Sequence, residues 1–85
     1  MSTWAAEAIR EVRSAHRPTP LRTLSVGRTE LVMKDETALP TGSTKHRTVA
    51  AMFCHAIASG DINGDTQVIT ATAGPVAIAA ALFAT

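Results

Sequence analysis

Apolar residues recur at helical spacing near the N-terminus of the chain, and this pattern predicts a first helix. Its cap is Ser2 or Thr3, because a short hydroxyl side chain accepts a free amide at a helix start. The helix stops near His16, since Pro18 restricts the residue before it and cannot continue the hydrogen-bond ladder. The apolar face of this helix comprises Trp4, Ala8, Ile9 and Val12.

Two further helices are predicted in the second half of the chain. One spans about residues 44–58, with Ser43 as its N-cap and Gly60 just past its end. A third begins near Gly74 and Pro75, where proline occupies its favoured first-turn position. The buried stripe predicted for the helix over residues 44–58 consists of Val49, Met52, Phe53, Ala56 and Ile57.

Strands are predicted at residues 29–34 (TELVMK), after a turn at Gly27 and Arg28, and at residues 66–70 (TQVIT), after the turn DINGD. The order strand, helix, strand, helix is typical of a βαβ unit, in which a right-handed crossover joins two parallel strands. The predicted fold class is therefore α/β, a partial three-layer βαβ unit of a parallel sheet. Parallel sheets usually contain more strands than this. We therefore expect residues 1–85 to be the N-terminal, incomplete segment of a larger domain.

Charge is distributed unevenly along the 85 residues. All eight Lys and Arg residues lie at or before Arg47, whereas residues 48–85 carry only Asp61 and Asp65. A net charge of +1 favours neither a nucleic acid nor a membrane surface as partner. The single cysteine, Cys54, cannot form an internal disulfide, so we expect a cytoplasmic protein. No apolar run approaches the ~20 residues that span a bilayer.

Lys45 stands at the first turn of a predicted helix, where the helix dipole disfavours a cation. It precedes Val49 by four residues, so helical spacing places it on the apolar stripe. A lysine turned inward there should have a depressed pKa, and a neutral amine forms Schiff bases with carbonyl compounds. Alternatively, its stem packs on the apolar face while the ammonium reaches water. Spacing alone favours the alternative.

Two polar turns shift that balance towards a reactive lysine. KDETALPTGST precedes one helix and TATAGP precedes the next, each after a predicted strand. In an open parallel sheet both turns lie at the carboxyl edge, where ligands bind. Each helix start also offers free amides to an anion. A reactive amine beside two such turns suits an anionic carbonyl cofactor.

At these residues the chain resembles the fold-type II pyridoxal-phosphate enzymes, which include cysteine synthases, cystathionine β-synthases and cysteine desulfhydrases. The segment KDE…PTGSTKHR, from Lys34 to Arg47, looks like the one that carries their cofactor lysine. TPL at residues 19–21 matches the opening motif of the family, and the resemblance covers roughly residues 17–84. His46 and Arg47 after the lysine lean towards the desulfhydrase-like branch.

The resemblance implies pyridoxal 5'-phosphate as cofactor and β-elimination or β-replacement on cysteine or O-acetylserine. Lys45 would hold the cofactor covalently and later move the substrate α-proton. No metal is implied, and the full-length enzyme would be a homodimer with an amino-acid substrate. The cofactor-binding residues would be Lys45, Ser43 and Gly74, and the substrate carboxylate would be received by Thr72, Ala73 and Gly74.

The second loop departs from the family pattern T/S-S-G-N-T. Ala73 lacks the serine hydroxyl, and Pro75 supplies neither the amide side chain nor a backbone N–H. The glycine-rich phosphate loop of the family has no match either. We therefore expect these 85 residues to be inactive by themselves. The alternative is a non-catalytic degenerate relative or an interaction fragment.

Other motifs carry less weight. GSTK does not have the P-loop spacing. The alternation of Asp61, Asn63 and Asp65 opens like a calcium loop but lacks its later glycine and glutamate, so we predict a turn. His46 and His55 are interpreted as ordinary helix residues. Asp35 and Glu36 follow Lys34 at a strand end, where they should be exposed unless one of them pairs with Arg47.

Overall fold

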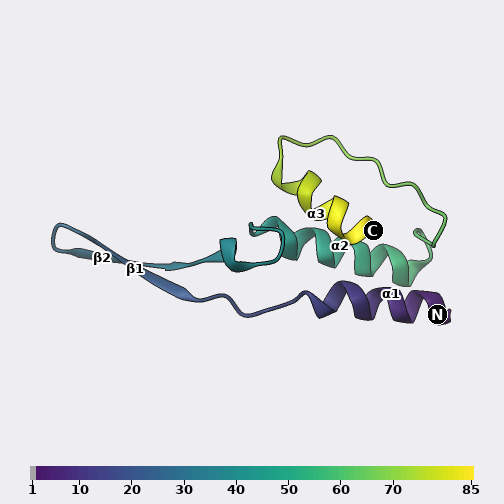
Figure 1. Cartoon of the computed structure of the whole chain (residues 1–85), viewed down its shortest axis with the longest axis horizontal. Helices are drawn as coiled ribbons and strands as arrows, with labels where there is room; N and C mark the ends of the chain where they lie inside the picture. The colour runs from purple at the N-terminus through teal and green to yellow at the C-terminus, as the bar shows by residue number, and fades with distance from the viewer. Residues whose placement is uncertain (1) are drawn as a thin grey trace.

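The computed structural model describes residues 2–85 and has two parts, a bundle of helices and a hairpin that projects from it (Figure 1). The bundle contains α1 (Thr3–Ser14), α2 (Lys45–Ser59) and α3 (Pro75–Ala84). The hairpin contains β1 (Leu21–Val26) and β2 (Thr29–Lys34), and the short 3-10 helix η1 (Glu36–Ala38) leads back to the bundle. The molecule is therefore elongated, with principal extents of 55 × 25 × 17 Å.

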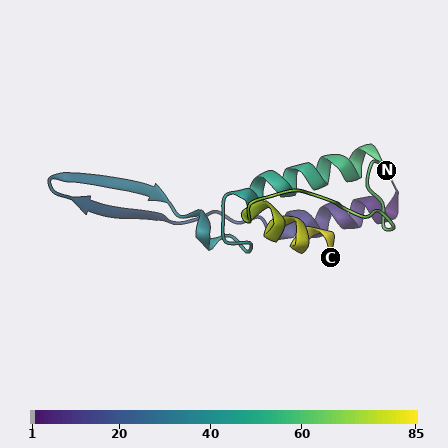
Figure 2. The same cartoon turned by 90° about the horizontal axis from the view of Figure 1, so that it is seen from above.

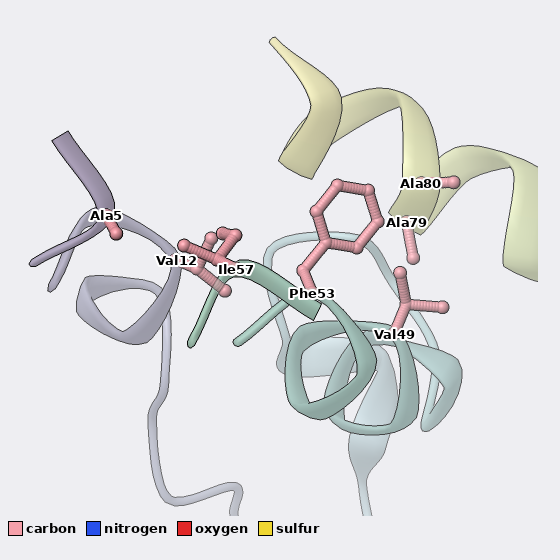
Figure 3. Close-up of a cluster of buried hydrophobic side chains, with 7 residues drawn as sticks. All are labelled: Ala5, Val12, Val49, Phe53, Ile57, Ala79 and Ala80. Carbon is pink, nitrogen blue, oxygen red and sulfur yellow. The ribbon is translucent and has the colours of Figure 1, made fainter. Parts of the chain in front are cut away.

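The helix α2 lies at the centre of the bundle and packs against both α1 and α3. Ile57 lies beside Val12 of α1, whereas Val49 and Phe53 face α3, so α2 uses neighbouring parts of one stripe for its two partners (Figure 3). The buried residues that α3 contributes to this contact, Ala79 and Ala80, are small. The buried cluster consists of Ala5, Val12, Val49, Phe53, Ile57, Ala79 and Ala80.

All three helices begin close to the predicted positions, and α1 and α2 also end close to them, because the signals are local. The predicted N-cap of α2 was one residue early, since Thr44 and not Ser43 occupies that position. The Ser2 hydroxyl accepts a hydrogen bond from the Ala5 amide at 3.1 Å and so caps α1. Gly60 ends α2 in the left-handed region at φ 86°. Pro75 is the first residue of α3, as predicted.

The buried stripe of α2 differs from the predicted one. Val49, Phe53 and Ile57 are buried as expected, but Met52 is 63% exposed and the stripe begins with His46. Spacings of three and four residues from His46 to Val49, Phe53 and Ile57 define one helix face. The prediction that Met52 belongs to the buried stripe was therefore wrong. The buried residue in the first turn is His46 and not Lys45.

The hairpin pairs its strands antiparallel, from Leu21 opposite Lys34 to Val26 opposite Thr29. A two-residue loop joins them, and Gly27 adopts φ 60° there, which glycine reaches without strain. The β2 strand and the turn at Gly27 and Arg28 were predicted, but β1 was not. Every residue of both strands is exposed.

The predicted parallel pairing between residues 29–34 and residues 66–70 is not formed. The strand β2 pairs with β1 instead, and residues 66–70 belong to no strand, with Ile69 86% exposed. A strand needs a ladder partner for its backbone groups, and the hairpin offers β2 a partner only two residues away. The described residues form a small α/β structure with a two-stranded antiparallel sheet. They do not form the three-layer parallel unit.

Within residues 2–85, no helix has both the length and the apolar character needed to cross a bilayer.

Candidate functional site

The site predicted from the sequence lies where α2 and α3 begin. Both helices start at the end of the bundle that faces the hairpin, and two perpendicular views agree on this placement (Figures 1 and 2). The long connection after α2 runs back along the bundle to reach this end. The two polar turns therefore occur at one end of the helix bundle, although no parallel sheet places them there.

Lys45 is the first residue of α2, and its side chain is exposed. The hydroxyl of Ser43 accepts a hydrogen bond from the Lys45 amide at 3.2 Å, while Thr44 at the N-cap position makes no side-chain hydrogen bond. Within residues 2–85, no ion pair or side-chain hydrogen bond engages the Lys45 amine. The prediction that Lys45 lies on the buried stripe was wrong, so the expected desolvation is absent. The amine is uncommitted.

His46 takes the buried position that was predicted for Lys45. Its side chain is 1% exposed, its Nδ1 lies 3.2 Å from the Thr41 hydroxyl, and its ring packs on Phe83 of α3. The other ring nitrogen, Nε2, is buried and has no hydrogen-bond partner in the described chain. Burial lowers the pKa of His46, and the positive charge of Arg47 adds to this effect. The buried role of His46 was not predicted. The spacing of His46 from Val49 and Phe53 was the signal available in the sequence.

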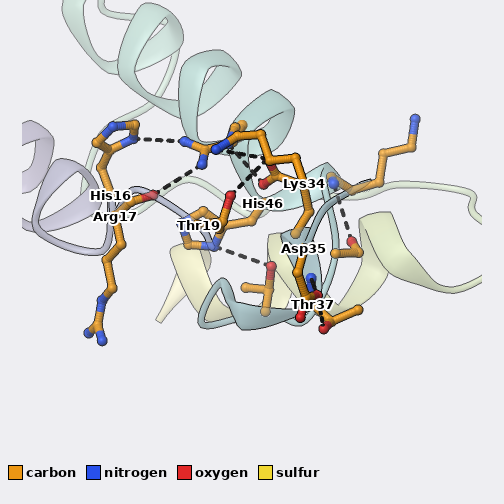
Figure 4. Close-up of polar contacts among 12 residues, drawn as sticks. His16, Arg17, Thr19, Lys34, Asp35, Thr37 and His46 are labelled. Atoms are coloured by element: carbon orange, nitrogen blue, oxygen red, sulfur yellow. Dashed lines mark hydrogen bonds and ion pairs between the residues drawn. The ribbon is translucent and has the colours of Figure 1, made fainter. Parts of the chain in front are cut away.

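Arg47 joins three segments that are separate in the sequence. Figure 4 shows the polar contacts in this region, with His16, Arg17 and Thr19 among the labelled residues. Its Nε donates to the Glu36 carboxylate at 2.9 Å, and Nη2 donates to the Arg17 carbonyl at 3.0 Å. Its Nη1 lies 3.3 Å from Nδ1 of His16. Glu36 also accepts a hydrogen bond from the Thr19 hydroxyl at 3.3 Å. Asp35 and Glu36 were expected to be exposed unless one of them paired with Arg47, and Glu36 does form this ion pair.

Asp35 fixes the turn between β2 and η1. It accepts hydrogen bonds from the Thr37 hydroxyl and, at 3.1 Å, from the Thr37 amide, and Arg22 of β1 donates to it at 3.1 Å. These hydrogen bonds, first the one from the Thr37 hydroxyl and then the one from Arg22, hold the pKa of Asp35 below its ordinary value. The base of the hairpin is thereby tied to the turn that leads to Lys45.

The second predicted loop precedes α3. The Thr72 hydroxyl accepts a hydrogen bond from the Gly74 amide at 3.2 Å, and Gly74 adopts φ 153°. Thr72 and Ala73 are exposed, and a side chain at Gly74 would meet nothing within 4 Å, so the space beside this loop is open. Pro75 follows with no N–H to offer.

Comparison with known proteins identifies the family of this chain. Residues 12–85 match the family described as pyridoxal-phosphate dependent enzyme. The chain belongs to this family. The resemblance noted in the sequence is confirmed, and the cofactor on which the family depends is pyridoxal phosphate.

One relative bears on the branch of the family. The chain is 46% identical over 55 residues to L-cysteine desulfhydrase Cds1 of Mycobacterium tuberculosis (strain ATCC 25177 / H37Ra). This match covers 65% of the chain but only 15% of the relative, so the chain corresponds to a small part of that protein. No solved structure matches.

The residues at this end of the bundle fit the cofactor of the pyridoxal-phosphate enzymes. An aldehyde needs an amine that is not already paired, and Lys45 offers one. An anionic group needs an accessible loop or helix start, and the loop before Gly74 is open and exposed. The individual roles of Lys45, Ser43, Thr72, Ala73 and Gly74 stay predictions.

Proposed function

We propose that this chain carries the cofactor lysine of a pyridoxal-phosphate enzyme that acts at the β-carbon of cysteine or a related amino acid. The observation that carries the proposal is the uncommitted amine of Lys45 at the start of α2 in a chain of this family. Similarity to a cysteine desulfhydrase supports β-elimination, with release of sulfide, over β-replacement on O-acetylserine.

Each residue of the site has a stated task in this proposal. The Lys45 amine would hold the cofactor and would take the proton from the substrate α-carbon. The bound cofactor supplies an electron sink for the charge left at that carbon. Ser43 holds the Lys45 amide and so orients the first turn of α2. Thr72, Ala73 and Gly74 receive the substrate carboxylate.

Reduction with borohydride tests the role of Lys45 directly. The complete protein is incubated with pyridoxal phosphate and reduced, and its peptides are mapped by mass spectrometry. The chain contains two lysines, Lys34 and Lys45, so each serves as the control for the other. We expect the label on Lys45, its loss in Lys45→Arg and its retention in Lys34→Arg. Equal labelling of both lysines, or none with cofactor bound, contradicts the proposal.

The reaction is tested by its products. β-Elimination from cysteine gives sulfide, ammonia and pyruvate in equal amounts, whereas β-replacement on O-acetylserine consumes sulfide and yields acetate and cysteine without pyruvate. We expect pyruvate and sulfide to appear together when the complete protein is given cysteine. Cysteine formed from O-acetylserine without pyruvate contradicts the elimination part of the proposal and leaves the role of Lys45 intact.

A further inference from the structure

We propose that Arg47 is a positioning residue for Lys45. Its guanidinium ties the start of α2 to two other segments and so fixes the backbone from which the Lys45 side chain extends. This inference rests on the proposed role of Lys45 as the cofactor lysine. It assigns to Arg47 no contact with cofactor or substrate.

The contacts of Arg47 come from two other parts of the chain. Glu36 belongs to η1, just after the hairpin, and pairs with Nε of Arg47 at 2.9 Å. Arg17 and His16 belong to the connection between α1 and β1, and they meet Nη2 and Nη1 of Arg47 at 3.0 Å and 3.3 Å. A planar guanidinium with several fixed donors suits such a junction better than a lysine ammonium does.

The ion pair at this junction is shielded from water. The side chains of Arg47 and Glu36 are only 28% and 19% exposed, whereas Arg22, in the ion pair at the base of the hairpin, is 64% exposed. Glu36 also accepts a hydrogen bond from the Thr19 hydroxyl at 3.3 Å. This hydrogen bond orients the Glu36 carboxylate towards Arg47. A charge-assisted hydrogen bond in a shielded site restrains both partners more strongly than an exposed pair does.

Lys45 lies between anchored neighbours. Ser43 holds its amide, His46 is buried against Phe83, and Arg47 is bound at the junction. The backbone at Lys45 is therefore restrained on both sides while its amine is left free. Reactions of a bound amine depend on such positioning, since small displacements of the reacting atom lower the rate markedly. Loss of the junction would let the whole first turn of α2 shift.

The experiment compares Arg47→Gln, Arg47→Lys and Glu36→Gln with the control Arg22→Gln in the complete protein. Arg22→Gln removes a nearby ion pair that does not involve α2. The readouts are the dissociation constant of pyridoxal phosphate, the circular dichroism of the bound cofactor and the melting temperature. We expect Arg47→Gln to weaken cofactor binding about tenfold, because the amine of Lys45 is then no longer held in position. It should also reduce the cofactor dichroism, with Arg47→Lys intermediate and Arg22→Gln unchanged.

A second readout needs no cofactor. Hydrogen exchange at the amides of Lys45 and His46 should accelerate in Arg47→Gln and in Glu36→Gln, but not in Arg22→Gln. If wild-type Lys45 takes no label with borohydride, the proposed function fails, and the exchange data still decide whether Arg47 restrains the turn. If Arg47→Gln does not fold, the isosteric Glu36→Gln gives the answer. The inference is overturned if Arg47→Gln lowers the melting temperature but leaves cofactor affinity, cofactor dichroism and hydrogen exchange unchanged.

Discussion

The ring of His46, near the start of α2, packs against the ring of Phe83 in α3, with centroids 5.0 Å apart and planes tilted by 57°. Phe83 also contacts Phe53 of α2, at a centroid distance of 5.9 Å. The three rings join α2 to α3, and His46 directly follows Lys45 in the chain. A change in the charge of His46 should therefore be felt both in the stability of the bundle and at the lysine.

The buried imidazole predicts a loss of stability at mildly acid pH. Burial lowers the pKa of His46 in the folded state from 6.5, with smaller effects from the charges of Arg47, His16 and Arg17 against an opposing carbonyl at Ala15. The unfolded state therefore binds more protons than the folded state in this range. The stabilisation is complete above pH 6.5 and is lost as the pH falls through the lowered pKa. Melting temperatures between about pH 5 and pH 8 measure this.

The matched variants for this prediction are His46→Gln and His55→Gln, because His55 is an exposed histidine on the same helix. We expect His46→Gln to flatten the slope of melting temperature against pH and His55→Gln to leave it as in the wild type. The same slope in His46→Gln and in the wild type would show that His46 does not titrate with unfolding.

Phe53 and Met52 are neighbours on α2 with opposite expected effects. Phe53 is buried against α3, whereas Met52 is 63% exposed. We expect Phe53→Ala to lower the free energy of unfolding by about 3–5 kcal/mol. Met52→Ala should change it by no more than about 0.5 kcal/mol. Urea denaturation of the two variants measures the difference, and equal losses would contradict the observed orientation of α2.

Local signals explain how much of the fold could be predicted. Ser2, Gly60 and Pro75 act within one turn of their own helix, so the predicted start of α1, end of α2 and start of α3 were nearly correct. The parallel strand at residues 66–70 depends on a partner far away in the sequence, and no pattern within the segment ensures that the partner is present. The missed strand β1 had a local signal. A two-residue connection that begins with glycine, between two apolar stretches, is typical of a hairpin.

The candidate site was predicted less completely than the family. The segment from Lys34 to Arg47 was sufficient to recognise a pyridoxal-phosphate enzyme, because its residue types and spacing are specific. The orientation of Lys45 was wrong by one residue, since a rotation of about 100° per residue separates a buried position from an exposed one. The junction at Arg47 joins residues 31 positions apart, and helical periodicity carries no information about such contacts.

Gly60 tests the end of α2. Its φ of 86° lies in the left-handed region, where a Cβ is strained although nothing lies within 4 Å of the added atom. We expect Gly60→Ala to lower the free energy of unfolding by about 1 kcal/mol. Gly60→Asn should lose less, because asparagine tolerates this conformation better. Thermal melts of both variants check the order, and a greater loss for Gly60→Asn than for Gly60→Ala would contradict it.

Pro75 tests whether the loop before α3 serves the cofactor. The family pattern T/S-S-G-N-T has asparagine at the position of Pro75, and an asparagine side chain would offer the cofactor a hydrogen-bond donor, whereas Pro75 has neither a side-chain donor nor an N–H. Pro75→Asn should therefore lower the dissociation constant of pyridoxal phosphate in the complete protein about tenfold, the effect of one good hydrogen bond. Pro75→Ala restores the backbone N–H alone and is the control. Because both variants lose the preset φ of proline at the first turn of α3, a modest fall in melting temperature should accompany each of them.

Tighter binding in Pro75→Asn alone would assign the gain to the side chain, and equal gains would assign it to the backbone N–H. Unchanged binding in both variants would mean that this loop does not face the cofactor, and that Thr72, Ala73 and Gly74 need another role.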